Sequence, residues 1–409
     1  MRKRWRYAFP VALVGTAAVW WMSSTAGTPP PGPATAQAAP MTPPPKFAPP
    51  ASEPAQRGAP FTAAGLAERK ERLALWQQRL AHAKRTLAAY QASTRYPYDS
   101  RPASEHLDQW QPHPTIANDM PLLQPGGAPA PGVRVHTTQQ AVYASAGDAV
   151  RLTVGAVDAD GKPLPLRILR SNAHAPLDTT AAAKPVSAPM VAQPFVDDGT
   201  QGDAQSGDEV WTSRLAPAAE GFGAYAGVIR TELTIQVGEA QGYVAFDVVY
   251  APEVPATWTG PVREALEGGS LELYLAAQVA QAGRYVVNGR VDDATGKPFA
   301  FVSFNDELGT GAQQVKLTLH GRLVRDQRPV FPLTLHDVDG FLLKPDAYPD
   351  RALMPPRDGV VFTTRKYSLG QFGDASFASD ETQRYVAEYG KDVALAQQQV
   401  DQLTASTGP

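Results

Sequence analysis

Residues 146–164 read AGDAVRLTVGAVDADGKPL, and residues 282–299 follow the same plan as AGRYVVNGRVDDATGKPF. Each copy starts with a small residue and a glycine, continues through an apolar and β-branched stretch, and ends in Val-Asp and Gly-Lys-Pro. This order predicts a strand that leads into a tight turn, because Asp starts turns, Gly adopts positive φ and Pro opens the next strand. The repeat therefore predicts two related β modules.

Similar stretches lie on both sides of the two copies, with turn residues about every eight to twelve positions, which favours antiparallel sandwiches over βαβ units. In Val315-Lys-Leu-Thr-Leu-His320, for example, apolar residues alternate with polar ones, as on a half-buried strand. The predicted strands are Val133–Thr137, Ala149–Val157, Val228–Val237, Tyr243–Tyr250, Leu271–Val279, Arg284–Val291, Ala300–Asn305, Val315–Val324, Val330–Leu335 and Val360–Lys366.

The segment 197–212 reads DDGTQGDAQSGDEVWT. It resembles the DDGxxGDxxxGDxxYT segment of bacterial surface and periplasmic proteins that carry an Ig-like "choice-of-anchor X" domain. Trp211 stands where that segment usually has Tyr. The resemblance covers only this segment and is compatible with the strands predicted between 145 and 250. It implies an Ig-like fold and an exported location, and it implies no activity.

The same segment holds four carboxylates, Asp197, Asp198, Asp203 and Asp208. Calcium prefers oxygen ligands of this kind, so the four are candidate calcium ligands, although their spacing does not match an EF-hand loop. The alternative is a turn structure in which the Asp side chains bind their own backbone. The short motifs 158–161 and 337–340 are likewise expected to be turns.

The N-terminus predicts export. Four positive charges in MRKRWR precede an apolar run from Tyr7 to Met22, and no charged residue follows until Lys46. This is the pattern of a signal peptide or a signal anchor whose basic end stays in the cytoplasm. Small residues such as Ala26 would suit cleavage, whereas Trp20 and Trp21 would suit the aromatic belt of an uncleaved anchor. Both alternatives place the rest of the chain outside the cytoplasm, whereas a third alternative, an internal helix, would not.

Two heptad patterns flank the β modules. After a Pro-rich spacer, Leu66, Leu73, Leu80 and Leu87 repeat every seven residues, with a second set of seam positions between them. Near the C-terminus, Val386, Val393 and Val400 repeat in the same way, and Ser379 or Asp380 is a candidate helix cap. Each helix is expected either to pack on a domain surface or to pair with the other, in the same chain or across a dimer.

Composition and motifs argue against several function classes. The chain of 409 residues has no Cys and a net charge of −3, which excludes disulfides and thiolate metal sites and leaves no basic footprint for nucleic acid. No nucleophile elbow, phosphate-binding loop or HExxH motif occurs. His320 and His336 lie on neighbouring predicted strands and are interpreted as structural. The sequence therefore predicts no enzyme and no cofactor apart from the candidate calcium.

The predicted fold class is mainly β, with two Ig-like antiparallel β-sandwich modules flanked by two long heptad-patterned helices, plus an N-terminal membrane helix. The predicted boundaries are a signal-anchor segment at 1–27, a Pro-rich linker at 28–60, a heptad helix at 61–93, a Pro-rich connector at 94–131, sandwiches at 132–256 and 257–375, and a C-terminal heptad helix at 376–409.

The predicted function is that of a non-enzymatic scaffold or interaction protein, anchored by one pass in a bacterial inner membrane with most of the chain in the periplasm. The helices would form a stalk, and the partner would be an envelope protein or a second copy of the chain bound through the heptads. The alternative is an exported carbohydrate- or calcium-binding module, for which Trp211, Tyr225 and Trp258 are candidate stacking residues.

Overall fold

The computed structural model describes residues 63–112, 114–176 and 189–405. These residues form two compact units, one made of residues 63–88 and 384–405 and the other of residues 89–383. The predicted membrane segment 1–27 and the Pro-rich linker 28–60 lie outside the described residues.

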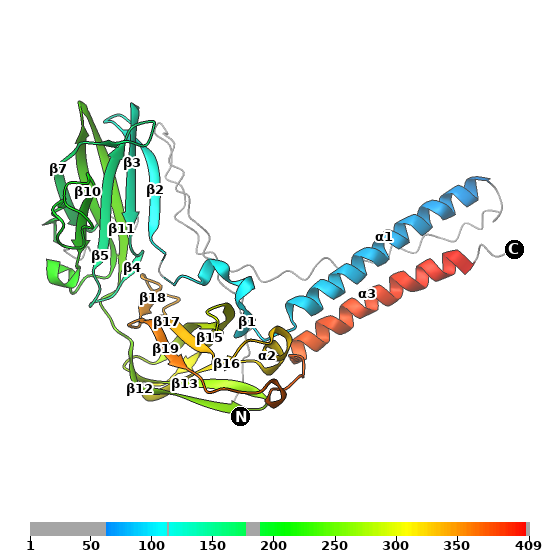
Figure 1. Ribbon diagram of the computed structural model, residues 1–409. Coiled ribbons are helices and arrows are strands. Elements are labelled where there is room, and N and C mark those ends of the chain that lie inside the picture. The colour runs from blue at the N-terminus through cyan, green and yellow to red at the C-terminus, as the bar shows by residue number, and fades with distance from the viewer. Residues whose placement is uncertain (1–62, 113, 177–188, 406–409) are drawn as a thin grey trace. The chain divides into compact units, whose positions relative to one another are not determined.

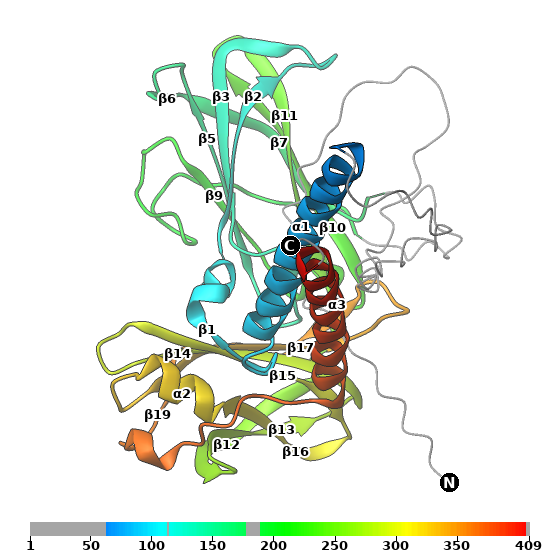
Figure 2. The same ribbon diagram turned by 90° about the vertical axis from the view of Figure 1, so that its right-hand side faces the viewer.

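The first unit consists of two helices. Helix α1 (Ala63–Ser93) and helix α3 (Asp380–Ala405) run antiparallel and side by side (Figures 1 and 2). Between them, Lys84 Nζ donates to Gln397 Oε1 at 3.3 Å. At the start of α3, the Ser379 hydroxyl accepts the Thr382 amide at 3.1 Å, which satisfies one of the free N–H groups of the first turn.

The predicted fold class is wrong in its helical part. Among the described residues, no helix is long and apolar enough to cross a membrane. The helices also do not bury apolar heptad seams, because Leu66 is 49% exposed and only Ala83 and Ala396 are buried in the described parts of α1 and α3. The physical reason is that two helices cover each other along one narrow line only. Small alanines fit that line, and the larger seam residues stay partly in water.

The first sandwich belongs to the second unit and has two sheets. One sheet has the order β2-β3-β5-β6, with β9 also paired to β5, and the other has the order β4-β11-β10-β7-β8. Most pairs are antiparallel, but β4 pairs with β11 in parallel, which departs from the antiparallel prediction. The strands are β2 (Ile116–Leu123), β3 (Pro129–Gln139), β4 (Tyr143–Ala144), β5 (Val150–Val157), β6 (Pro163–Leu164), β7 (Leu166–His174), β8 (Val191–Ala192), β9 (Trp211–Leu215), β10 (Gly227–Val237) and β11 (Ala240–Tyr250).

Buried and outward-pointing residues alternate along these strands. One face of each sheet therefore packs into the core, and the other faces solvent. On β10, every second residue from Gly227 to Val237 is buried, and Ile229, Leu233 and Ile235 have no exposed surface. Leu152 and Val154 on β5 meet them from the opposite sheet. The residues between the buried ones therefore point outward, and on β5 these include Arg151 and Thr153.

The second sandwich pairs a larger sheet with a three-stranded sheet. The larger sheet has the order β1-β15-β14-β17-β18 with β19 also on β17, and the smaller has the order β12-β13-β16. Leu273, Leu317 and Leu335 are among its fully buried core residues. The elements are β1 (Ser100–Pro102), β12 (Ala256–Glu267), β13 (Ser270–Val279), β14 (Gly283–Asp292), β15 (Pro298–Leu308), β16 (Gly311–Leu319), α2 (Gly321–Gln327), β17 (Thr334–Leu343), β18 (Arg351–Leu353) and β19 (Arg357–Thr363).

Several stretches differ from their predicted structure. The segment 94–131, expected to be a connector, contains β1, which pairs with β15 of the second sandwich, and β2, which pairs with β3 of the first. The strand expected over Val315–Val324 ends at Leu319 and gives way to α2. Asp337 and Asp339, expected in a turn, lie inside β17, where Asp337 has a φ of 47° and the pairing register shifts.

Candidate binding surface on the first sandwich

The outward face of the β3-β5-β9 sheet carries a row of polar side chains. Thr138 on β3 lies opposite Thr153 on β5, and their hydroxyl oxygens are 2.6 Å apart. Thr153 in turn lies opposite Thr212 on β9. Cross-strand Thr pairs of this kind stabilise a sheet. The face is thus polar along this row, partly exposed at Thr138 and Thr153 and buried at Thr212.

The loop 197–210 enters this sheet through a bridge between Val196 and Thr212. Asp197 organises the loop, because its carboxylate accepts the amides of Gly207 at 2.7 Å, Asp208 at 3.2 Å and Glu209 at 3.1 Å. Left-handed backbone at several loop positions gives the tight curvature that these bonds need, including Glu209 with a φ of 64°. The loop is therefore fixed by its own hydrogen bonds.

Asp203 connects the loop to the polar face. It is 8% exposed, accepts the Gly199 amide at 2.7 Å with one oxygen, and accepts the Thr212 hydroxyl at 3.2 Å with the other. Asp198, by contrast, is exposed, and its carboxylate is bonded within its own turn and not to the polar face. The hydroxyl and the amide of Thr200 donate to it, and these bonds lower the pKa of Asp198.

The predicted calcium ligands come together only in part. Asp197, Asp203 and Asp208 each offer a carboxylate oxygen, and these oxygens lie within 4.8 Å of one another, whereas Asp198 is not among them. The same carboxylates accept backbone amides and a hydroxyl, as the alternative turn structure requires. The geometry therefore accommodates both interpretations, and calcium binding by the three grouped residues stays a prediction.

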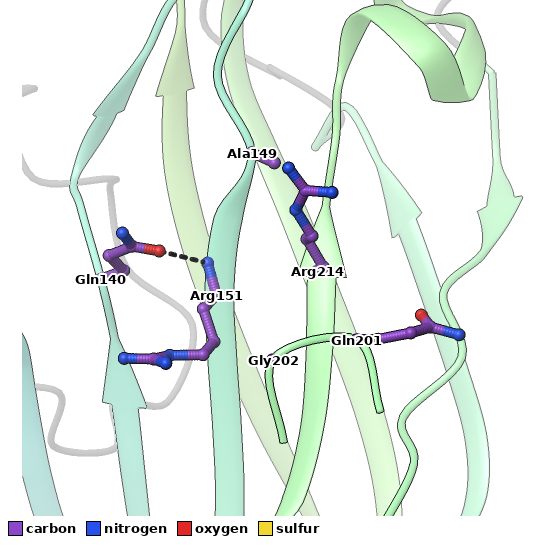
Figure 3. Close-up of a pocket in the computed structure, with 6 residues that line it drawn as sticks. All are labelled: Gln140, Ala149, Arg151, Gln201, Gly202 and Arg214. Atoms are coloured by element: carbon purple, nitrogen blue, oxygen red, sulfur yellow. Dashed lines mark hydrogen bonds between the residues drawn. The ribbon is translucent and has the colours of Figure 1, made fainter. Parts of the chain in front are cut away.

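An open pocket of about 300 Å³ lies beside this loop. Two residues of the loop and four residues in or beside the neighbouring strands line it. Figure 3 shows these six residues: Gln140, Ala149, Arg151, Gln201, Gly202 and Arg214. Gln140 Oε1 accepts the backbone amide of Arg151 at 3.2 Å. The two guanidinium groups extend away from each other, with that of Arg214 directed toward Ala149 (Figure 3).

The two pocket arginines were not singled out from the sequence. Each is an exposed residue on a strand with buried neighbours, and such residues are common on any sandwich. Alternation around Leu152 predicts that Arg151 points outward, and alternation around Leu215 predicts the same for Arg214. Their neighbourhood depends on the pairing of β5 with β9, which the sequence pattern does not specify.

The two histidines of the neighbouring predicted strands lie in different surroundings. His320 precedes helix α2, its Nδ1 has no hydrogen-bond partner among the described residues, and burial lowers its pKa. His336 lies in β17 between two carboxylates, with Nδ1 2.8 Å from Asp337 Oδ2 and Nε2 3.3 Å from Asp292 Oδ2. Both ring nitrogens of His336 therefore face acidic groups, and its structural role stays a prediction.

The candidate stacking aromatics are tied into the cores. Trp211 and Tyr225 are partly buried against the first core, and the Tyr225 hydroxyl donates to the Val228 carbonyl at 2.8 Å. Trp258 packs on the second core and donates from Nε1 to the Pro355 carbonyl at 2.8 Å. All three side chains are only partly exposed.

No protein-family model matches the chain, and no curated protein matches it. Among solved structures, the chain is similar to a DUF4785 family protein from Legionella pneumophila, with 12% identity and a TM-score of 0.38 over 56% of this chain and 57% of that one. It is also similar to the adhesin InvE of Yersinia pseudotuberculosis, with 12% identity and a TM-score of 0.18 over 54% of this chain and 58% of that one. The chain thus matches less than two thirds of the length of each, and we take no function from them.

Proposed function

We propose that this chain is a non-enzymatic binding protein of the bacterial cell envelope, which holds its partner at the outward face of the first sandwich. The observation that carries the proposal is the fixed loop 197–210 beside the polar face and the open pocket between them. A loop held by its own hydrogen bonds presents its groups without a large ordering cost on binding, which favours affinity. The basic and apolar N-terminal pattern supports an exported location.

The proposal is tested by crosslinking in cells that express the protein with a C-terminal tag, followed by detergent extraction and purification. The proposal expects a specific adduct that is lost when Gln201 in the pocket is replaced by a bulky residue, as in Gln201→Trp. The matched control is Leu169→Trp, because Leu169 is 46% exposed on the other sheet of the same sandwich. An adduct that survives Gln201→Trp and disappears in Leu169→Trp would place the binding surface elsewhere.

Calcium binding is a second candidate function, and one observation favours it. The three grouped carboxylates of Asp197, Asp203 and Asp208 supply the hard oxygen atoms that calcium prefers. A carbohydrate-binding function has no comparable support, because its candidate aromatics are packed on the two cores.

A further inference from the structure

We propose that Arg151 and Arg214 form a binding site for a phosphoryl group. The inference deepens the proposed function and rests on it, because the phosphoryl group would belong to the molecule that the first sandwich holds. The site is the open pocket beside the loop 197–210, in which these two residues are the charged lining groups.

The two arginines are direct neighbours across the sheet. Arg151 on β5 lies opposite Arg214 on β9 in the antiparallel register. Residues in that relation have Cα atoms about 4.5–5.5 Å apart, so two exposed side chains on the same face can reach one ligand. Like charges directly opposite each other destabilise a sheet. A bound anion would therefore relieve the repulsion between the two guanidinium groups.

Two arginines elsewhere on the same sandwich pair with carboxylates, whereas Arg167 and Arg170 on β7 form no ion pair among the described residues. Arg230 on β10 lies opposite Asp247 on β11, and its guanidinium donates to both carboxylate oxygens at 2.7 Å. Arg134 on β3 likewise pairs with Asp119 at 2.7 Å. By contrast, neither Arg151 nor Arg214 has a carboxylate within salt-bridge distance among the described residues. Their guanidinium donors are available for a ligand.

Neutral residues complete the lining of the pocket. Gln140, Gln201 and Gly202 line it beside the two arginines, and the Gln201 side chain extends away from both arginines (Figure 3). The next loop residue, Asp203, has both oxygens engaged, by the Gly199 amide and the Thr212 hydroxyl. The loop therefore reaches the arginines with neutral groups, and its acidic groups serve the loop itself.

The charge of the pair points to the ligand class. Each guanidinium presents a planar fork of N–H donors that binds a carboxylate or a phosphate through two parallel bonds. One arginine matches the single charge of a carboxylate, whereas two arginines match the dianion and the several oxygens of a phosphate monoester. The two groups point apart (Figure 3), and a bound phosphate would draw them together.

The test is isothermal titration calorimetry of the full chain with inorganic phosphate at low ionic strength, where screening is weak. We expect saturable binding to one site that weakens at least tenfold in Arg151→Gln and in Arg214→Gln. Arg167→Gln is the matched control, because Arg167 is also an exposed strand arginine but lies on β7 of the other sheet. It should bind phosphate as the unchanged protein does.

Three results would overturn the assignment. The first is the absence of saturable phosphate binding, and the second is equal weakening by Arg167→Gln, which would show a general charge effect. Acetate that binds as tightly as phosphate would also contradict a phosphoryl site. Titration with glycerol 3-phosphate distinguishes free phosphate from a phosphate group carried by a larger molecule. Glycerol 3-phosphate that binds more tightly than inorganic phosphate indicates the larger molecule.

The inference and the proposed function can fail separately. If Arg151→Gln and Arg214→Gln keep the cellular adduct that Gln201→Trp removes, the surface binds its partner without a phosphoryl group. Both arginines are exposed, so circular dichroism and thermal melting should show the same fold in the variants and the unchanged protein. That comparison excludes misfolding as the cause of lost binding.

Discussion

Asp158 and Asp293 hold the same position in equivalent turns of two different sandwiches. Each donates its amide to the carbonyl of the lysine four residues on, Asp158 at 2.9 Å and Asp293 at 3.0 Å. Each carboxylate also accepts the backbone amides two and four residues further along. Gly161 and Gly296 complete the two turns at φ values of 81° and 79°. The repeated sequence therefore encodes a repeated hairpin.

Asp293→Ala should destabilise the second sandwich by about 1–3 kcal/mol, because the amides of Thr295 and Lys297 and the Thr295 hydroxyl lose their acceptor. Asp293→Asn keeps an oxygen acceptor and should recover much of the loss. Urea denaturation with Asp158→Ala as the matched change in the first sandwich measures the effect. Equal stability of Asp293→Ala and the unchanged protein would contradict this account of the turn.

The stability that the Asp293 turn contributes should depend on pH. The Thr295 hydroxyl lowers the pKa of Asp293 below its usual value. A carboxyl whose pKa is lower in the folded state adds stability above its unfolded pKa, and this stability is lost as the pH falls through the folded pKa. The stability difference between the unchanged protein and Asp293→Asn should therefore shrink in acid below the ordinary Asp range.

Asp99 should show the opposite pH dependence. Burial raises its pKa to about 6, the charge of Glu272 adds to the shift, and its Oδ1 is buried without a hydrogen-bond partner among the described residues. A raised pKa stabilises the fold in acid, and the gain is lost as the pH rises from about 4 to about 6. Asp99→Asn should thus stabilise the protein at pH 7, by up to about 3 kcal/mol, and leave it unchanged or weaker near pH 4. Equal shifts at both pH values would show that the charge of Asp99 is not the cause.

Gly321→Ala should prevent normal packing between the start of α2 and the turn before β13. A Cβ at this position would lie 2.1 Å from the Gly269 carbonyl oxygen and 2.8 Å from the Gly373 backbone nitrogen. Both neighbours are backbone atoms, so the clash cannot be relieved by a rotamer change, and we expect a loss of more than about 3 kcal/mol. Gly370→Ala is the control, since nothing lies within 4 Å of its Cβ. Thermal melting of the two variants should differ clearly.

The order of the loop 197–210 should depend on Asp197. In Asp197→Ala the amides of Gly207, Asp208 and Glu209 lose their acceptor, and their hydrogen exchange should accelerate at least tenfold. Asp198→Ala removes an exposed carboxylate that binds only Thr200, so the same three amides should keep their protection. Acceleration in both variants would mean that the loop is not held in the way described.

Calcium binding is tested on chelator-treated protein by calorimetry. If the three grouped carboxylates hold the ion, one calcium should bind per chain, and Asp208→Asn should remove the binding. Asp198→Asn should bind calcium as before, because Asp198 lies outside the group. The absence of binding in the unchanged protein would leave the carboxylates as backbone acceptors alone.

Features that depend on residues close together in the sequence were predictable from the sequence pattern. The turns at Asp158 and Asp293 follow from residues within five positions, so the sequence pattern indicates them directly. Strand β1 has only the residues Ser100–Pro102 and gains its place through pairing with β15, which no local pattern encodes. The predicted strand over Val315–Val324 ends at Leu319, and the close approach of Gly321 to the backbone of Gly269 and Gly373 is a contact that no local pattern encodes.

In the candidate site, too, the sequence pattern indicates one part, and only strand pairing determines the other. The carboxylates of the loop were visible as a motif, although Asp198 separates from the others in space. Arg151 and Arg214 carry no motif, and only the β5-β9 register brings them together. The heptad prediction failed for a related reason, since the burial of a seam depends on how many helices cover it.

Residue-specific photo-crosslinking in cells tests most directly whether the outward face of the first sandwich binds a partner. A photoreactive amino acid is placed at Gln205, an exposed residue of the loop 197–210, and at Leu169 on the other sheet as the control. We expect one specific adduct at Gln205 that Arg151→Gln and Arg214→Gln together weaken, and none at Leu169. No adduct at Gln205, or the same adduct at both positions, would contradict a binding surface on the outward face of the first sandwich.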